Sequence, residues 1–133
     1  MSVILEQIDK ERIAVAAALG IRVHTAREWL YLSYDSVGQT LYEAIHDTPA
    51  YRGIKAPDNI HHRYIFEDIP MSLVPIASIA KMLKVSTPTI ESIVRLACVM
   101  HGRDYWKEGR TVEKLGISGM NLKEIRQLAV GMD

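Results

Sequence analysis

The sequence predicts an all-α fold, a compact multi-helix domain of about six to eight helices, some of them short. Apolar residues recur three and four positions apart through most of the chain, which is the spacing of one helical face. No window alternates apolar and polar residues over the length of a strand with turns to match. The chain has 133 residues, 48% of them hydrophobic, enough for one core. Because we find no repeat, low-complexity segment or linker, residues 1–133 are predicted to form a single helical domain.

The first part of the chain predicts three helices. Residues 2–19 carry an apolar stripe that stops at Gly20, and glycine in the left-handed conformation ends many helices. Thr25 stands three residues before Glu28, the spacing of a reciprocal capping box, so a second helix is predicted to begin there. After a short break, a third helix is predicted to end at His46.

The middle of the chain predicts a connector followed by two helices. Residues 47–61 contain two prolines, a glycine and an Asp-Asn pair, which indicate an ordered connector and not a strand. Pro75 opens the next apolar stripe, where proline is tolerated because the N–H that it lacks would be unpaired in a first turn. Thr87 as cap, Pro88 at the first helical position and Gly102 after the end delimit the clearest helix.

The last part of the chain predicts two shorter elements. Residues 110–116 have the pattern of a short turn of helix. Asn121 and Glu124 have the spacing of a capping box, and the apolar residues that follow lie on one helical face. A final helix is therefore predicted to begin at Asn121.

Composition narrows the classes of function. Sixteen basic and sixteen acidic residues cancel, so the net field that draws a protein to nucleic acid or to an anionic membrane is absent. We therefore predict neither as a partner. The single cysteine, Cys98, lies in an apolar run and is predicted to be an inert buried thiol. Without a disulfide, a membrane-spanning stretch or a secretory signal, the expected location is the cytoplasm.

One alternative reading is a helix-turn-helix. The segment "IASIAKMLKVSTPTIESIVRLA" has two amphipathic helices joined by a tight turn, the arrangement of many DNA-binding domains. A recognition helix needs side chains near its start that reach bases or phosphates. Here the start offers Thr87 and Glu91, and Arg95 lies about two turns in. A DNA-binding or protein-interaction domain therefore stays open as the alternative function.

The segment "HHRYIFEDIPMSLVP" has the highest density of reactive side chains. Glu67 and Asp68 are neighbours, and neighbours on a helix point about 100° apart, so they form no shared-proton pair by themselves. Arg63 precedes Glu67 by four positions, as Tyr64 precedes Asp68, so each pair shares a helical face. The plain interpretation is an exposed ion pair and an aspartate that caps the helix before Pro70.

The histidines do not predict a metal site. His61 and His62 lie near two acids, but zinc needs three or four converging ligands and adjacent histidines diverge. His24, His46 and His101 are isolated and are predicted to lie at the surface or in hydrogen bonds of the core. The glycines never form a G-x-G-x-x-G loop after a strand. We therefore expect no metal and no dinucleotide to be bound by this chain alone.

The same segment resembles a known family. "HHRYIFEDIPMSLVPIASIAKMLKVSTPTIESIV", with "YRGIKAP" before it and "GRDYWKEGRTVEKLGISG" after it, is similar to the carboxy-terminal helical domain of the opine dehydrogenases, the octopine and nopaline type. The opening "IDKERIAVAAALGI" resembles the first long helix of that domain, so the likeness covers nearly the whole chain. It implies a helical domain like those of opine and 6-phosphogluconate-type dehydrogenases.

The resemblance implies a function and roles for five residues. Opine dehydrogenases use NAD or NADP to reduce the imine that a 2-oxo acid forms with an amino acid. Asp68 would be the catalytic member here, orienting a general acid–base histidine and keeping it charged. Arg63 would clamp a substrate carboxylate through two parallel hydrogen bonds, and His62, Tyr64 and Glu67 would complete the substrate-binding wall.

The sequence departs from the family at its start. The family's catalytic histidine and its Rossmann domain precede the first helix of this region, and none of the five histidines here aligns with that histidine. The expected function is therefore a substrate-binding and interdomain-closing domain that is inactive alone. Its expected partner is a Rossmann domain or subunit of a parent enzyme. Apolar surface that such a partner would cover also predicts a homodimer.

Overall fold

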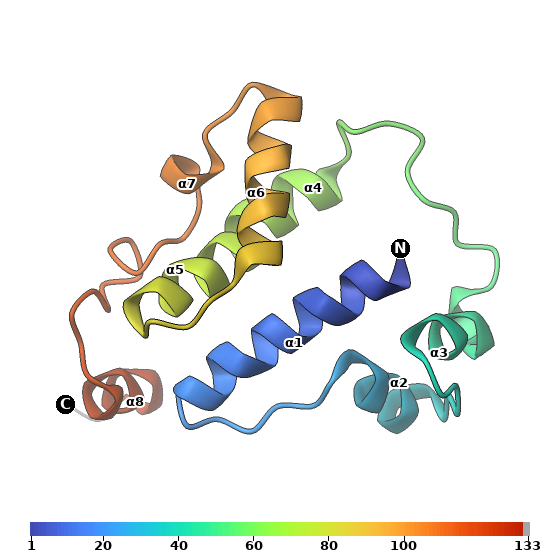
Figure 1. The fold of residues 1–133 in the computed structure, drawn as a ribbon, viewed down its shortest axis with the longest axis horizontal. Coiled ribbons are helices and arrows are strands. Elements are labelled where there is room, and N and C mark those ends of the chain that lie inside the picture. The colour runs from blue at the N-terminus through green and yellow to red at the C-terminus, as the bar shows by residue number, and fades with distance from the viewer. Residues whose placement is uncertain (132–133) are drawn as a thin grey trace.

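The computed structural model describes residues 1–131, and within them it confirms the all-α class, with helices and no strand. The α-helices are α1 (Ser2–Ala18), α2 (Ala26–Tyr34), α3 (Leu41–Asp47), α4 (Arg63–Asp68), α5 (Val74–Met82), α6 (Pro88–His101), α7 (Tyr105–Glu108) and α8 (Leu122–Val130). A 3₁₀ turn, η1 (Pro49–Tyr51), follows α3, and a π-turn, η2 (Ile69–Leu73), joins α4 to α5. In Figure 1 the long α1 separates α2 and α3 from α4, α5 and α6.

The starts and stops that the sequence predicts are confirmed at several helices. Gly20 and Gly102 follow α1 and α6 in the left-handed conformation, with φ of +73° and +61°. The capping boxes at the starts of α2 and α8 are present, with Thr25 and Asn121 as the capping residues. A third capping box, which begins at Thr40, starts α3.

Carboxylates of α1 hold the starts of two other helices. Glu6 Oε1 accepts the Leu41 N–H of α3 at 3.1 Å, and Asp9 Oδ2 accepts the Ala26 N–H of α2 at 2.8 Å. Both N–H groups belong to first helical residues, which have no partner within their own helix. Asp9 also pairs with Arg12 at 2.7 Å. The first helix is therefore the scaffold on which α2 and α3 are fixed.

The start of α6 is held in the same way. Here the sequence correctly predicts Thr87 at the cap position but not the group that caps the helix. Thr87 occupies the cap position, but its side chain makes no capping hydrogen bond. The buried carboxylate of Glu11 on α1 replaces it: Oε1 accepts the Thr89 N–H at 3.0 Å and Oε2 the Ile90 N–H at 2.9 Å. The difference is tertiary, since Glu11 lies 78 positions from Thr89 and no local pattern signals the pairing.

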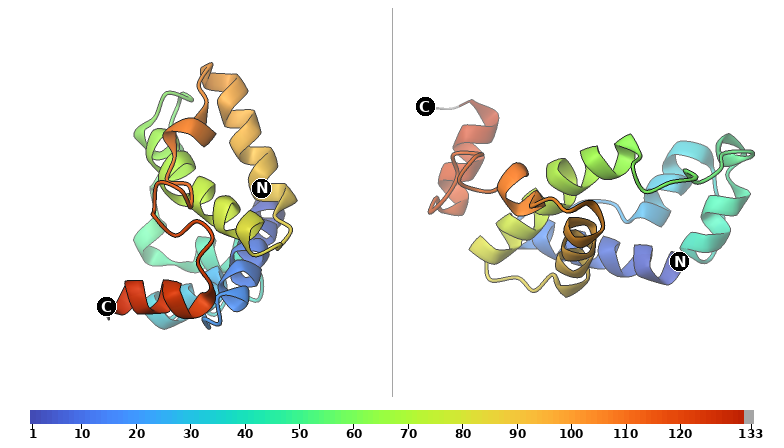
Figure 2. Two further views of the ribbon diagram at one scale, coloured as in Figure 1. Left: turned by 90° about the vertical axis from the view of Figure 1, so that its left-hand side faces the viewer. Right: turned by 90° about the horizontal axis from the view of Figure 1, so that it is seen from above.

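Helices α4 and α5 form one continuous rod (Figures 1 and 2). The sequence predicts that Asp68 ends the first helix before Pro70, but the chain continues through the π-turn. There the Val74 N–H bonds to the Ile69 carbonyl, and Pro75 has no N–H to donate. The Pro70 carbonyl, left without a helical partner, accepts the Arg110 N–H at 3.0 Å.

The apolar core has two parts. The main cluster lies between α5, α6, α7 and η2, with Ile8 of α1 against it, and its buried members are Ile69, Val74, Ala77, Ile90, Val94, Ala97 and Tyr105. A smaller cluster holds α2 to α3 and consists of Leu30, Leu41 and Ala44. The sequence predicts a connector over residues 47–61; in the structure the turn η1 occupies part of it, and residues 52–62 form no helix. Residues 112–116, within the segment predicted as a short turn of helix, form turns after α7. Helix α8 contributes no buried residue.

Candidate functional site

Four of the five residues predicted to form the site share the outer face of α4. Arg63, Tyr64, Glu67 and Asp68 are all exposed, and helical geometry spreads them over about 140° of one face. The opposite face is partly or fully buried and consists of Ile65, Phe66 and Ile69. The apolar face fixes the rotation of α4 on the core, and this rotation presents the polar side chains together.

The side chain of Arg63 lies beside Tyr64. Its guanidinium carbon is 5.5 Å from the centre of the Tyr64 ring, within the range of a cation–π contact. The ion pairs found among residues 1–131 do not include Arg63 with Glu67, the exposed pair that the plain interpretation of this segment expects. Both charges therefore remain available to a ligand.

His62 serves as the cap of α4. Its Nδ1 accepts the Tyr64 N–H at 3.3 Å, and its half-buried ring stands edge-on to the Tyr64 ring at 4.4 Å between centroids. Because Nδ1 accepts this hydrogen bond, Nε2 is the ring nitrogen left for another partner. His62 thus lies next to Arg63 and Tyr64, as predicted, but part of its hydrogen-bonding capacity maintains the helix.

Asp68 lies at the end of α4, one residue before the π-turn. In this chain its side chain is exposed. No hydrogen bond or ion pair joins its carboxylate to another residue of the part of the chain that the structure describes. Any shielding of Asp68 must therefore come from outside residues 1–131.

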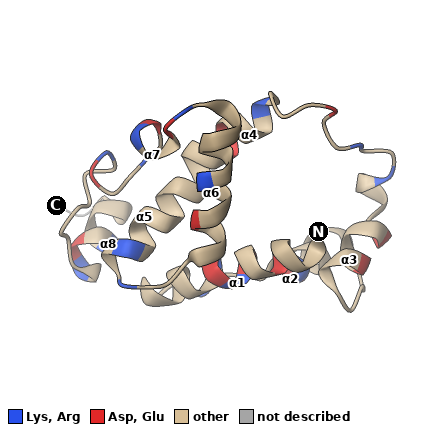
Figure 3. Cartoon of the chain, turned by 45° about the horizontal axis from the view of Figure 1, so that its top comes forward, with Lys and Arg blue, Asp and Glu red and all other residues tan. Residues whose placement is uncertain are grey.

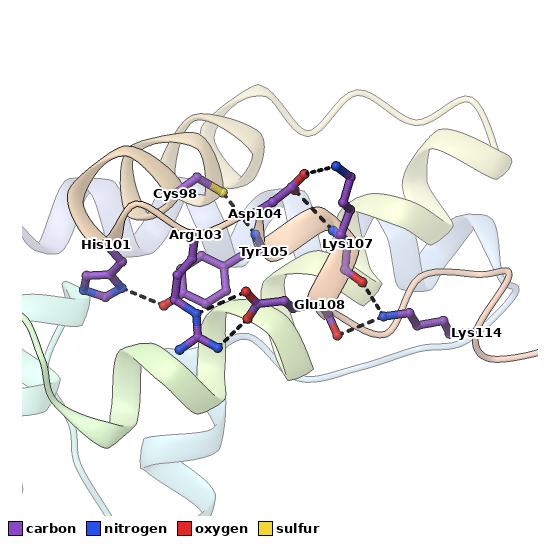
Figure 4. A network of polar contacts seen from close by, with 8 residues as sticks. All are labelled: Cys98, His101, Arg103, Asp104, Tyr105, Lys107, Glu108 and Lys114. Carbon is purple, nitrogen blue, oxygen red and sulfur yellow. Dashed lines mark hydrogen bonds and ion pairs between the residues drawn. The ribbon is translucent and has the colours of Figure 1, made fainter.

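The inner side of this region contains a cluster that sequence reasoning missed. His101 at the end of α6 lies against Phe66 of α4, with 4.8 Å between ring centroids. Figure 4 shows its hydrogen bond to the Tyr105 hydroxyl and the bidentate pair between Arg103 and Glu108, with distances of 3.1 and 2.6 Å. His101 and Tyr105 are four positions apart, but α6 ends at His101. The two residues are therefore not on one helix, and their spacing does not predict this contact.

Two groups in the cluster have shifted pKa values. Hydrogen bonding to Glu108 raises the pKa of Arg103, so its guanidinium is charged throughout the accessible pH range. Burial raises the pKa of Tyr105, and the nearby Arg103 offsets only part of that effect. Tyr105 therefore stays a neutral hydroxyl that can donate a hydrogen bond.

The cavities do not coincide with the outer face of α4. A cavity of about 660 Å³ lies between α5, α6, α7 and the turn that follows, and Lys81, Glu91, Trp106 and Glu113 contribute to its wall. None of the five predicted site residues lines it. The face of α4 is an exposed wall in this chain and not an enclosed pocket.

The geometry of residues 1–131 supports neither a metal site nor a DNA-recognition helix. No group of three or more histidine, cysteine or acidic side chains comes together there as metal ligands. At the start of α6, the N–H groups that a phosphate would need are occupied by Glu11, and Glu91 is exposed beside them. In the ribbon view of Figure 3, the positions of basic and acidic residues are interspersed along the described chain.

Comparison with known proteins gives a consistent set of relatives. Residues 1–101 match the family model for the alpha-helical domain of NAD/NADP octopine/nopaline dehydrogenase. The opine dehydrogenase of Arthrobacter sp. (strain 1C) is 43% identical over 121 residues, which is 91% of this chain and 34% of that protein. Protein ocs of Agrobacterium tumefaciens (strain Ach5) is 31% identical over 122 residues, 89% of this chain and 33% of that protein.

A shorter match extends the set. The D-nopaline dehydrogenase of Agrobacterium tumefaciens (strain T37) is 34% identical over 92 residues, 68% of this chain and 22% of that protein. The chain thus spans about a third of the length of the first two relatives. Among residues 1–131, no helix combines the length and the apolar character needed to cross a bilayer.

Proposed function

Because this chain belongs to the octopine/nopaline dehydrogenase family through its alpha-helical domain, we propose that it is the substrate-binding and interdomain-closing domain of an opine dehydrogenase-like oxidoreductase. The reaction would be the NAD(P)H-dependent reductive condensation of a 2-oxo acid with an amino acid. The observation that carries this proposal is the outer face of α4. It presents Arg63, Tyr64, Glu67 and Asp68 together, exposed and without ion-pair partners among the described residues.

Arg63 is proposed to bind a substrate carboxylate. A guanidinium offers two parallel N–H donors that match the two oxygens of a carboxylate, a geometry that lysine lacks. Its contact with the Tyr64 ring supports this role, because it limits the directions in which the long side chain can point. Tyr64, Glu67 and His62 complete the wall, and Glu67 is suited to a substrate ammonium group.

Asp68 is proposed to act on a histidine that a partner supplies. A carboxylate that accepts the N–H of an imidazole fixes its tautomer and orientation and stabilises its charged form. Asp68 lies on the same exposed face as Arg63, so one approaching surface can meet both. Closure of a partner over this face would also provide the shielding that Asp68 lacks in this chain.

The described residues do not fit a dinucleotide. They contain no strand, and therefore no strand, glycine loop and helix to cradle a pyrophosphate. We assign no step of a hydride transfer to them, and we propose that NAD or NADP is held by a Rossmann domain or subunit of the parent enzyme. In that case this chain alone is inactive. The cytoplasm is the compartment proposed for it, in keeping with its single cysteine and lack of disulfides.

Substitutions in a full-length enzyme that contains this domain test the proposal. We expect Arg63→Lys to lower kcat/KM for the 2-oxo acid by about 10- to 100-fold, since one charge-assisted hydrogen bond is lost. We expect Asp68→Asn to lower kcat by about 100-fold or more, as for loss of a group that supports general acid–base catalysis. Because both side chains are exposed, thermal unfolding of the variants should match the parent.

Arg52→Lys on the connector is the matched control, since Arg52 is an exposed arginine outside α4. It should leave kinetics unchanged. Parent-like kinetics in both Arg63→Lys and Asp68→Asn would reject the assignment of these residues. Turnover by residues 1–133 alone would reject the proposed dependence on a partner.

A further inference from the structure

His101 makes a hydrogen bond from each of its ring nitrogens. Nδ1 lies 2.6 Å from the Tyr105 hydroxyl and Nε2 lies 2.8 Å from the Ile60 carbonyl oxygen. The first contact joins the end of α6 to α7, and the second joins it to the connector, 41 positions away in the sequence. The half-buried imidazole of His101 thus links α7 to the connector.

The partners of His101 determine which nitrogen carries the proton. A carbonyl oxygen only accepts, so the bond to Ile60 requires a hydrogen on Nε2. Tyr105 is fully buried, and its raised pKa keeps its hydroxyl protonated, so the hydroxyl donates to Nδ1. The Nε2–H tautomer satisfies both bonds and also gives the Tyr105 hydroxyl hydrogen an acceptor. A hydrogen on Nδ1 would leave the buried Tyr105 hydroxyl without an acceptor among the described residues.

Aromatic rings hold the imidazole in place. His61 stacks on it at 5.4 Å between centroids with an interplanar angle of 26°, and Phe66 of α4 lies at 4.8 Å and 34°. The Arg103 guanidinium lies over the rings of Phe66 and Tyr105, at 5.3 and 5.5 Å. His101 is therefore in contact with one residue of the connector and with one residue of α4.

The connector has few other attachments. Within the described chain, the bond from His101 is the one hydrogen bond between residues 55–61 and the helices α4 to α7. The His61 ring adds its stacking on His101 and Phe66. Ile60 lies two residues before His62, the cap of α4, and three before Arg63. The place where the connector is fixed therefore determines where α4 begins and how its first residues are presented.

We propose that His101 is a positioning residue for the substrate-binding face: its Nε2–H imidazole, fixed between the Tyr105 hydroxyl and the Ile60 carbonyl, sets the start of α4 and so the placement of His62 and Arg63. The relevance to substrate rests on the proposed function. The positioning itself does not, because it is a property of the chain without substrate. His101 touches none of the groups assigned to substrate contact, so its effect is transmitted through Ile60 and Phe66.

Nuclear magnetic resonance on the isolated chain tests the proposal. We expect the imidazole nitrogen shifts of His101 to report the Nε2–H tautomer at neutral pH. We expect His101→Phe, which keeps a ring for stacking but loses both hydrogen bonds, to lower the heteronuclear Overhauser effects of residues 58–62 and to shift the Arg63 amide. His101→Gln, whose amide N–H can still reach the Ile60 carbonyl, should stay closer to the unaltered chain.

His46→Phe is the matched control. His46 also bonds a carbonyl, that of Tyr42, but it lies on α3, so its substitution should leave residues 58–63 unchanged. An Nδ1–H tautomer, or an unchanged connector and Arg63 amide in folded His101→Phe, would overturn the proposal. Equal loosening in His101→Gln and His101→Phe would also overturn it, because the hydrogen bond would then not be the cause. If His101→Phe does not fold, the tautomer in the unaltered chain and the His101→Gln variant decide.

These outcomes are separate from the proposed function. If Arg63→Lys leaves the kinetics of a full-length enzyme unchanged, the face has no role in substrate binding, but the resonance results still hold. Conversely, if the connector is unchanged in His101→Phe, His101 has no positioning role, and Arg63 remains the proposed substrate-binding residue.

Discussion

Glu11 illustrates how one buried charge organises this chain. Its carboxylate is only 4% exposed and accepts the N–H groups of Thr89 and Ile90. Burial by itself raises the pKa of Glu11, but the hydrogen bonds from Ile90 and Thr89 lower it by more, so the net pKa lies below the ordinary value of 4.5. The charged form is therefore favoured by the fold, and the positive end of the α6 dipole lies beside it.

We predict that Glu11→Gln destabilises the chain by about 1–3 kcal/mol, the range for loss of a charge-assisted bond to buried donors. An amide can accept only one of the two N–H groups, and its own NH₂ group then faces the other. Chemical denaturation measures the change, and Glu67→Gln on the exposed face of α4 serves as a control for the loss of a charge. A Glu11→Gln variant as stable as the unaltered chain would contradict the role of Glu11 as the cap of α6.

At the residue scale, the sequence predicts which side chains carry chemistry better than it predicts what they touch. Arg63, Tyr64, Glu67 and Asp68 lie on one exposed face, as their spacing indicates. The contacts of Glu11 with Thr89 and of His101 with Ile60 cannot be predicted from the sequence, because the partners lie dozens of positions apart. Long-range pairing of this kind depends on how helices pack, which no local pattern records.

The π-turn is the main feature at the scale of the elements. It frees the Pro70 carbonyl, which accepts the Arg110 N–H, and this bond draws the chain after α7 onto the rod. The approach is so close that a Cβ on Gly109 would lie 2.8 Å from the Pro70 oxygen and 2.6 Å from Val74 Cγ1. Glycine is needed at position 109 for space, since its φ of −70° is ordinary.

We predict that Gly109→Ala destabilises the chain by about 1–3 kcal/mol, the usual cost of added volume in a closely packed site. The obstacle includes backbone oxygen atoms of Pro70 and Tyr105, which a side-chain rotation cannot move. Thermal unfolding measures the loss. Lys107→Ala on the exposed side of α7 should leave the midpoint almost unchanged. An equally small effect of Gly109→Ala would show that the 109–112 segment does not lie on the rod.

At this scale, the capping boxes in the sequence are reliable, and Pro70 is misleading. Thr25 and Asn121 start helices as predicted, because a capping box is satisfied by residues three positions apart. Pro70 predicts the end of a helix, because proline lacks the N–H that a helical hydrogen bond needs. In the structure the chain continues through the π-turn instead. Helix α7 has four residues, too few for an apolar stripe, and was not predicted.

Hydrogen-bonded carboxylates link the stability of the whole molecule to pH. The pKa values of Glu11, Glu28 and Glu113 all lie below the ordinary value: Glu28 is hydrogen-bonded to Thr25 and Glu113 to Thr111, with Lys81 nearby. A carboxylate whose pKa is lower in the folded state contributes stability above its unfolded pKa and loses it as the pH falls through the folded pKa.

We therefore predict that the free energy of unfolding is steady near neutral pH and falls as the pH drops below about 4.5, where these carboxylates begin to take up protons. Denaturation curves measured between pH 7 and pH 3 test this. Glu11→Gln should weaken the acid dependence, because it removes the buried member of the set. Unchanged stability down to pH 3 would contradict the assigned direction of the pKa shifts.

The outward face of α6 bears on the assembly of the whole molecule. Leu96, Val99 and Met100 are 58%, 76% and 42% exposed, and their spacing of three and four places them on one stripe. Solvated stripes of large apolar side chains are typical of interfaces. The partner proposed for this stripe is a second copy of the chain, since a helix stripe can pair with itself about a twofold axis. Such pairing would give the homodimer that the sequence analysis expects.

We predict that the isolated chain dimerises in a concentration-dependent manner and that the double substitution Leu96→Glu and Val99→Glu weakens the dimer by about tenfold or more, because paired stripes would then bury like charges. Sedimentation velocity over a range of concentrations measures the association. Val37→Glu is the matched control, since Val37 is 75% exposed and lies outside α6. Monomers at every concentration would contradict self-association, and a dimer equally weakened by Val37→Glu would move the interface away from α6.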